Sequence, residues 1–197
     1  MRDEILARVR ANRPPARPHP GAPPPSAAPA DPLAAFAAAS ALSRATTIRY
    51  DPGDGLSALL RQLHPDAAPR YVHPELVADY GAELADGAVA LRADATPHEL
   101  AAVQLAVLPA RLGVLENGAC WLDETCWPHR ALPFATEHLA LVLPRAALVP
   151  TMHEAYARCA AGPGFGVFIA GPSKTADIEQ SLVVGAQGPR SLAVVLV

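Results

Sequence analysis

The chain has 197 residues, which is enough for one domain of ordinary size and a tail. Hydrophobic residues make up 51% of it but aromatic residues only 5%, so we expect a core of closely packed Ala, Leu and Val. The net charge of −3 does not fit a general nucleic-acid binder, and no apolar run approaches the roughly 20 residues that a membrane span needs.

The N-terminal arm differs from the rest of the chain. Residues 1–12 predict a short amphipathic helix with Ile5, Leu6 and Val9 on one side. Residues 13–32 hold nine prolines and predict a flexible, partly polyproline linker. Because so short a helix is marginal in isolation, two interpretations stay open. The arm is either a tail without function or a tethered helix that docks on a partner or on its own domain.

Residues 33–197 predict one α/β domain in which helices and strands alternate. Helices are expected over six segments, namely 33–42, 56–63, 74–84, 96–108, 151–160 and 177–186. Strands are expected over 45–50, 69–73, 87–92, 138–144, 164–171 and 191–197, with two more around a turn within 111–122. The later strands are continuous apolar runs, which is typical of a mostly parallel sheet covered on both faces.

The segment 165–191 carries the strongest functional signal. A buried strand is predicted to end at Ala170, a sharp turn follows at 171–173, and Asp177 is placed to cap the next helix. Ligands of open α/β sheets bind at the carboxyl ends of strands, and free amides at a helix N-terminus favour an anion. The sequence therefore predicts a small anionic ligand at the loop 171–176.

Lys174 is the chain's only lysine and lies in this loop. A compact ammonium there either contacts a carboxylate or phosphate or is simply solvated.

Glu179 falls in the first turn of the predicted helix, where the helix dipole already favours a carboxylate. Ser173 is expected to cap the helix or bind ligand, since no histidine base stands beside it in the sequence. The loop does not have the G-x-x-x-x-G-K-[ST] spacing of a phosphate-binding P-loop.

Two residues outside the loop are candidates for catalysis. Glu116 lies in the turn between two apolar strands, where it could act as a general base, hold backbone amides in place or lie in solvent. His138 begins a strand and is either a hydrogen-bonded structural histidine or a ligand contact.

The cysteines limit the redox chemistry of this chain. Cys120, Cys126 and Cys159 are fewer than the four ligands that an iron–sulfur cluster usually takes. The spacing from Cys120 through Cys126 to His129 does not match the usual zinc patterns, so no metal site is expected. The charged N-terminus lacks the apolar region of a secretory signal, which predicts reduced thiols in the cytoplasm.

Three segments resemble the LUD-domain family. GPSKTADIEQSLVVGAQGP is similar to its C-terminal signature, GPS-x-[TS]-[AS]-DIE followed by G-V-H-G-P. VLENGACWL is similar to its A-E-T-G-T strand and turn, and LPFATEHLALVL to its L-P-x-x-H-I strand. The resemblance covers roughly residues 33–197. The positions that match are Glu116, Gly118, His138, Gly171, Pro172, Ser173, Asp177, Glu179, Gly185, Gly188 and Pro189.

The resemblance implies a three-layer α/β/α sandwich like that of the NagB/RpiA/CoA-transferase group. It also implies a role in oxidising L-lactate to pyruvate together with two cysteine-rich partner subunits that carry the iron–sulfur clusters. Asn117, Ala119 and Gln187 depart from the family pattern, and Gln187 replaces a histidine and cannot act as an acid or base.

The expected ligand-binding set combines the loop with the matched glycines. Its members are Gly118, Gly171, Pro172, Ser173, Lys174, Thr175, Asp177, Glu179 and Gly188. Two other functions stay open at this point. One is a stand-alone CoA-transferase-like enzyme acting on an acyl thioester or a phosphorylated sugar, and the other is a small-molecule sensor or scaffold.

Overall fold

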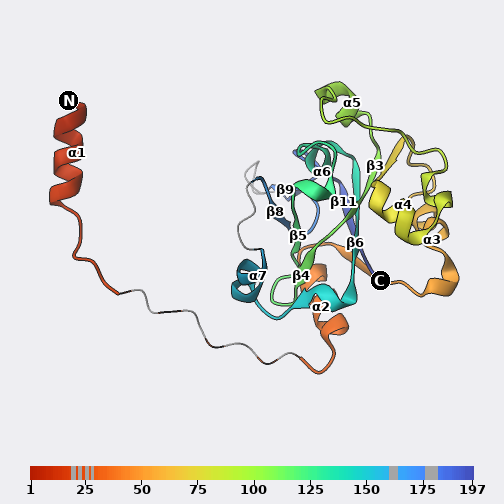
Figure 1. The fold of residues 1–197 in the computed structure, drawn as a ribbon, viewed down its shortest axis with the longest axis horizontal. Helices are drawn as coiled ribbons and strands as arrows, with labels where there is room; N and C mark the ends of the chain where they lie inside the picture. The colour runs from red at the N-terminus through yellow and green to blue at the C-terminus, as the bar shows by residue number, and fades with distance from the viewer. Residues whose placement is uncertain (19–20, 22–23, 25–26, 28, 160–163, 176–181) are drawn as a thin grey trace.

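The structure is a computed structural model that describes every residue except 19–20, 22–23, 25–26, 28, 160–163 and 176–181 (Figure 1). The α-helices are α1 (Arg2–Ala11), α2 (Pro32–Leu42), α3 (Leu56–Leu63), α4 (Pro74–Tyr80), α5 (Pro97–Ala101), α6 (Leu132–Ala135) and α7 (Met152–Arg158). The 3₁₀ helices are η1 (Pro52–Asp54), η2 (Ala82–Ala85), η3 (Glu124–Cys126) and η4 (Arg145–Ala147). No helix in these ranges is long and apolar enough to cross a membrane.

Eleven strands are described and they form three sheets. They are β1 (Thr46–Arg49), β2 (Arg70–Val72), β3 (Leu105–Pro109), β4 (Leu112–Val114), β5 (Cys120–Leu122), β6 (His138–Leu143), β7 (Leu148–Val149), β8 (Val167–Ile169), β9 (Lys174–Thr175), β10 (Val183–Val184) and β11 (Ser191–Leu196). The central sheet has the order β1-β11-β6-β3-β2, and all of its pairs are parallel. This confirms the predicted α/β class with a mostly parallel sheet.

The central strands alternate between two hydrophobic clusters. In β6, Leu139 and Leu141 point to one cluster while Ala140 and Val142 point to the other. Successive residues of a strand face opposite sides, so both faces of this sheet must be covered. The continuous apolar runs of β3, β6 and β11 follow directly from that double burial.

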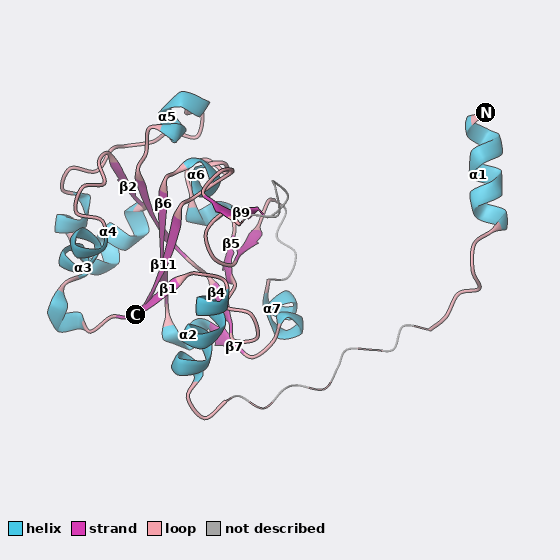
Figure 2. Cartoon of the chain, turned by 180° about the vertical axis from the view of Figure 1, so that it is seen from behind, coloured by secondary structure: helices cyan, strands magenta, loops and turns pink. Residues whose placement is uncertain are grey.

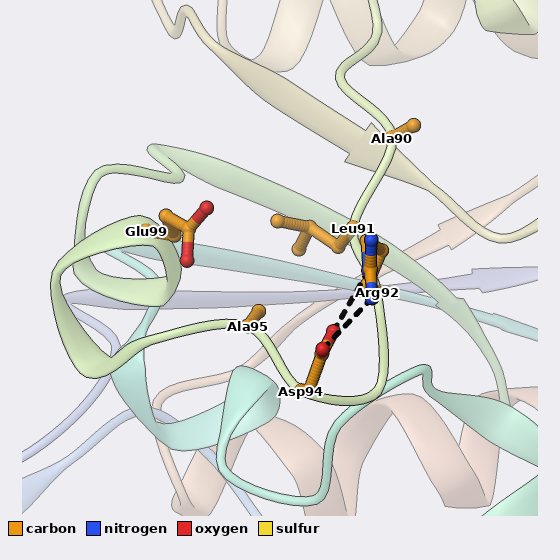
Figure 3. Close-up of a pocket in the computed structure, with 6 residues that line it drawn as sticks. All are labelled: Ala90, Leu91, Arg92, Asp94, Ala95 and Glu99. Atoms are coloured by element: carbon orange, nitrogen blue, oxygen red, sulfur yellow. Dashed lines mark hydrogen bonds and ion pairs between the residues drawn. The ribbon is translucent and has the colours of Figure 1, made fainter.

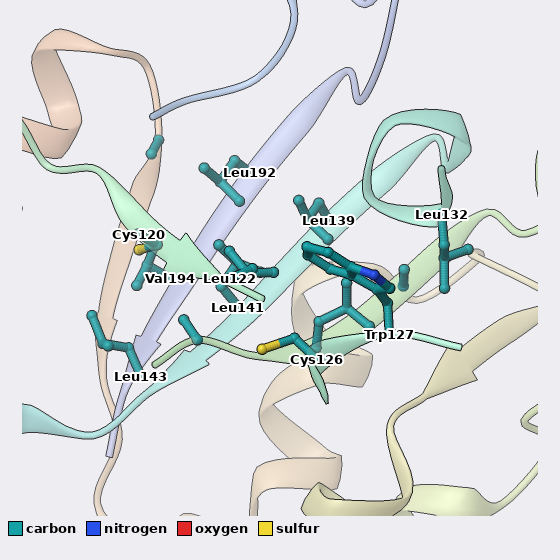
Figure 4. Close-up of a cluster of buried hydrophobic side chains, with 14 of the residues drawn as sticks. Cys120, Leu122, Cys126, Trp127, Leu132, Leu139, Leu141, Leu143, Leu192 and Val194 are labelled. Carbon is teal, nitrogen blue, oxygen red and sulfur yellow. The ribbon is translucent and has the colours of Figure 1, made fainter. Parts of the chain in front are cut away.

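Helices cover one face of the central sheet, and a second sheet covers most of the other. Leu56 and Leu60 of α3 and Leu76 of α4 pack on the first face. On the second face lie α2 and the small sheet β7-β4-β5-β8, and α7 packs outside that sheet (Figure 2). Figure 4 shows Cys120 and Leu122 of β5 meeting side chains of β6 and β11 in this second cluster.

Several predicted elements agree closely with the structure. The helix expected over 56–63 has those bounds, and α1, α2, α7, β1, β2, β6 and β11 lie within a residue or two of their predicted segments. Thr96 caps α5 in a reciprocal arrangement with Glu99, as its sequence indicates.

Five predicted elements need correction. The helix expected over 74–84 ends at Tyr80, where Gly81 separates it from η2, and the strand expected over 164–171 is limited to Val167–Ile169. Residues 87–92 form no strand, and only Ala88 makes an isolated bridge to Arg70. The helix expected over 96–108 ends at Ala101, because all of Leu105–Pro109 is buried between sheet neighbours and packing overrides helix propensity there. The end of the helix expected over 177–186 is wrong, since Val183–Val184 pairs with β9 as a strand.

The turn between β4 and β5 is held against α2 at Gly118. Its φ of +70° lies in the left-handed region, and an added Cβ would lie 2.5 Å from the backbone N and Cα of Ser40. Ser40 is itself fully buried, and its hydroxyl lies 2.9 Å from that of Thr47 in β1. A glycine at this position therefore lets the small sheet approach the helix.

We expect Gly118→Ala to lower the free energy of unfolding by about 2 kcal/mol or more, because it adds left-handed strain to a steric clash. Urea unfolding measured by circular dichroism checks this. Gly53→Ala is the matched control, since a Cβ there meets nothing within 4 Å. Equal stabilities for the two variants would contradict the tight approach of this turn to α2.

Candidate functional site

A cavity of about 300 Å³ lies beside the predicted ligand loop. Its described lining comes from α6, β6, β8, the loop after β8 and the segment before β11. The lining residues are Pro133, Phe134, Leu139, Phe168, Ile169, Ala170, Gly171, Pro172, Ser173, Lys174, Gln187, Gly188, Pro189 and Leu192. The structure thus brings together Gly171 to Lys174 and Gly188, which the sequence analysis placed in one site.

The cavity lies at an unexpected edge of the molecule. β8 belongs to the small sheet, where it pairs antiparallel with β5, so its end does not mark the carboxyl edge of the central sheet. Leu139 and Leu192 stand near the starts of β6 and β11, which places the cavity at the amino-terminal edge of the central sheet.

The loop is fixed by hydrogen bonds to the segment before β11. The Ser173 amide donates to the Pro189 carbonyl over 2.9 Å, and the Ser173 carbonyl accepts from the Gly185 amide over 2.9 Å. The Ser173 hydroxyl accepts from the Gln187 amide at 3.3 Å. The Ser173 amide is therefore already used, and Pro172 has none, so the expected row of open backbone amides is not present at these two positions.

Gly171 and Lys174 tie the loop to the end of α2. Gly171 has a φ of +78°, and a Cβ there would collide with the Ser43 carbonyl oxygen. The Lys174 ammonium donates to the same oxygen over 2.8 Å. Ser43 is the C-cap of α2, where a cation satisfies an unpaired carbonyl and the helix dipole. This contact was not anticipated, and it leaves Lys174 on the cavity wall.

The remaining predicted ligand residues lie elsewhere or outside the described part of the chain. Thr175 lies in β9 and pairs with Val183. The Glu116 carboxylate accepts from the Met152 amide at the start of α7 over 2.9 Å, which is the amide-holding role considered for it. Neither Glu116 nor Gly118 belongs to the described lining of the cavity. Asp177 and Glu179 lie outside the described residues.

His138 lies in a second cavity of about 300 Å³ on the same edge of the central sheet. The lining is Leu63, His64, Pro65, Asp66, Ala67, Gln104, Glu137 and His138. The His138 Nδ1 lies 2.8 Å from the Ser191 hydroxyl, which fixes the ring. His64 stacks on that ring with centroids 4.4 Å apart. Sequence reasoning missed His64 because 73 residues separate the two and no motif contains it.

Burial lowers the pKa of His64, and the nearby charge of His138 lowers it further. The same direction holds for His73, whose pKa is lowered first by burial. Both rings therefore favour the neutral form more strongly in the folded chain than in the unfolded one.

A third hollow lies beside α5 and is lined by Ala90, Leu91, Arg92, Asp94, Ala95 and Glu99 (Figure 3). Arg92 makes two bonds of 2.8 Å to Asp94, and the Glu99 carboxylate accepts from the amide and hydroxyl of Thr96. The bond from the Thr96 hydroxyl lowers the pKa of Glu99. These charged side chains are already paired with one another or with the N-cap of α5, so we assign no ligand to the hollow.

The cysteines are protected thiols. Burial raises the pKa of Cys120 to about 12 and that of Cys126 to about 11. Cys159 is half-buried, and burial raises its pKa as well. Within the described ranges, no group of three or more His, Cys, Asp or Glu side chains is arranged to hold a metal ion.

These features define an α/β domain with a parallel central sheet, a mixed second sheet and a ligand-sized cavity between them. The family model of the LUD domain matches residues 74–197, and the chain belongs to the LUD-domain family. A solved structure supports the fold. The crystal structure of a DUF162 family protein from Deinococcus radiodurans aligns with a TM-score of 0.62 at 16% identity, covering 84% of this chain and 95% of that one.

Two curated relatives carry the name "Lactate utilization protein C". The protein from Geobacillus thermodenitrificans is 32% identical over 95 residues, which are 45% of this chain and 40% of the relative. The protein from Geobacillus kaustophilus is 34% identical over 89 residues, which are 42% of this chain and 37% of the relative. The chain therefore matches about two fifths of the length of these relatives.

We expect the free energy of unfolding to fall as the pH drops through 6.5, the ordinary pKa of histidine. Because the folded pKa of His64 is lowered, the unfolded chain binds its proton more readily, and stability is lost until the pH passes below the folded pKa. His64→Gln should flatten part of this slope in urea titrations between pH 7.5 and 5.5. The exposed His153→Gln is the control, and an equal slope in both variants would contradict the assignment.

Proposed function

We propose that this LUD-domain protein serves lactate utilization by binding a small carboxylate, L-lactate or pyruvate, in the cavity beside Gly171 to Lys174. In this proposal it acts as a subunit in the oxidation of L-lactate to pyruvate, with two partner subunits that carry iron–sulfur clusters. The names of the two Geobacillus relatives support the lactate role. The observation that carries the ligand assignment is that Lys174 lines a cavity of suitable size, with its ammonium 2.8 Å from the Ser43 carbonyl oxygen.

The chemistry of the cavity suits a small hydroxy or keto acid. Its volume of about 300 Å³ is at the lower end for small-molecule sites. Leu139, Leu192 and Ile169, which share one hydrophobic cluster, supply apolar surface for a methyl group. An ammonium carries three N–H donors, and the bond to Ser43 uses one of them, so Lys174 can also donate to a carboxylate. Because the Ser173 amide is already bonded and Pro172 has none, Lys174 supplies the positive charge of the described cavity lining.

The thiols of this chain support placing the redox centres in partner subunits. Cys120 and Cys126 are packed among Leu122, Leu139 and Leu141 in the second cluster, and burial keeps both protonated. A cluster ligand must be a thiolate, which these positions disfavour. In the proposed reaction, the electrons leaving lactate therefore pass to centres outside this chain.

Genetic complementation in the native host tests the lactate role. Deletion of the gene should abolish growth on L-lactate while growth on glucose continues, and the wild-type gene should restore it. Purification of the tagged protein from lactate-grown cells should recover two cysteine-rich subunits with iron–sulfur absorption. Normal growth of the deletion strain on lactate would refute the proposed role.

We expect Lys174→Gln to weaken the binding of pyruvate or L-lactate about tenfold, the scale of a lost charge-assisted hydrogen bond. Glutamine keeps a donor for the Ser43 carbonyl, so the loop should stay in place. Isothermal titration calorimetry measures the affinity, and Arg92→Gln beside the other hollow is the matched control for loss of one positive charge. Equal affinities in the two variants would show that the carboxylate ligand does not bind at Lys174.

A further inference from the structure

α1 is a formed helix that exposes its apolar side chains to water. None of its residues is buried, and Ile5 and Val9, one turn apart, are 56% and 63% exposed. The helix is held by a 3.1 Å ion pair between Glu4 and Arg8, and its acidic first turn and basic last turn suit the helix dipole. Helices this short rarely persist alone, so these apolar side chains need a surface.

The arm and the domain carry opposite charges. Residues 1–17 contain five arginines against Asp3 and Glu4, which gives a net charge of +3. Because the whole chain has a net charge of −3, residues 18–197 carry −6. The docking surface for α1 is therefore expected to be acidic.

One layer of the domain concentrates this negative charge. Residues 50–86, which we term the acidic layer, hold seven Asp and Glu against Arg61 and Arg70. Glu75 is paired with Arg111 from outside this range, which leaves a net charge of −4. They include α3, α4 and η2, which cover one face of the central sheet. Asp51, Asp79 and Glu83 are exposed there. The larger half-buried apolar side chains that pack on the core in the same layer are Leu59, Val77 and Tyr80.

We propose that α1 of one copy docks on the acidic layer of a second copy of this chain. Ile5 and Val9 pack on the half-buried apolar side chains, and the arginines of the arm face the carboxylates around them. The charge of +3 on the arm meets −4 on the layer. Such charge complementarity gives specificity for the partner and accelerates association. It also makes the affinity of the complex depend on the salt concentration.

The tether favours a second copy over the chain's own domain. It joins the domain at Asp31, the N-cap of α2, and α2 packs on the face opposite the acidic layer. A polyproline segment of this length spans about 60 Å, and a domain of this size is about 40 Å across. To reach its own acidic layer, the linker would have to follow about half the circumference of the domain, about 60 Å, which would use its whole extended length.

Sedimentation equilibrium of the full-length protein in 50 mM salt tests the proposal. We expect a dimer whose dissociation constant rises at least tenfold in 500 mM salt and at least tenfold in the variant Ile5→Ser/Val9→Ser. The matched control is Leu42→Ser at the end of α2, which removes an 88% exposed apolar side chain outside the arm and should leave the dimer unchanged.

A charge exchange then tests the docking face. Arg10→Asp and Asp79→Arg should each weaken the dimer, and the double variant should recover part of the loss. A monomer at every concentration overturns the proposal, whether the arm is free or docked on its own domain. A dimer insensitive to the arm variants, or one that Asp79→Arg leaves unchanged, also overturns it. Neither result bears on growth on lactate, so this test and the test of the lactate role fail independently.

Discussion

The double burial of the parallel strands β3, β6 and β11 is the constraint on which the rest of the molecule depends. Every one of these strands sends alternate side chains into two separate hydrophobic clusters. With few aromatic rings available, both clusters rely on Leu, Val and Ala, so each face needs a closely fitting cover. Short helices supply that cover on one face. On the other, the small sheet and α2 supply it, and Gly118 allows their contact.

This construction explains which elements could be predicted from the sequence. α3 has clear 3.6-residue periodicity and β11 is a pure apolar run, so both were predicted closely. β3 was not, because Leu105–Pro109 follows good helix formers and only the tertiary context decides for a strand. Val183–Val184 pairs with β9 for a similar reason, since local propensity does not report which strands pair.

Part of the lining of the cavity could be predicted from the sequence, but the hydrogen bonds of the loop could not. Glycine, proline and serine at 171–173 indicated a tight turn, and the structure places this turn on a cavity wall. Its amide bonds could not be foreseen, because they depend on the segment before β11, which crosses the loop only in three dimensions. The same applies to Lys174, whose partner at Ser43 is 131 residues away. The spacing of residues along the sequence does not predict hydrogen bonds between distant segments.

Strand alternation also separates the residues that the family resemblance groups together. Leu139 and Leu192 face the cavity beside the loop, so their neighbours His138 and Ser191 must face the opposite side of the sheet. His138 therefore contacts His64 rather than Lys174. Both cavities are lined at the start of β6, and the start of β11 is tied to it by the 2.7 Å bond from the Arg190 amide to the Glu137 carbonyl. A change at one cavity can reach the other only by moving these two strand ends, which the core on both faces resists.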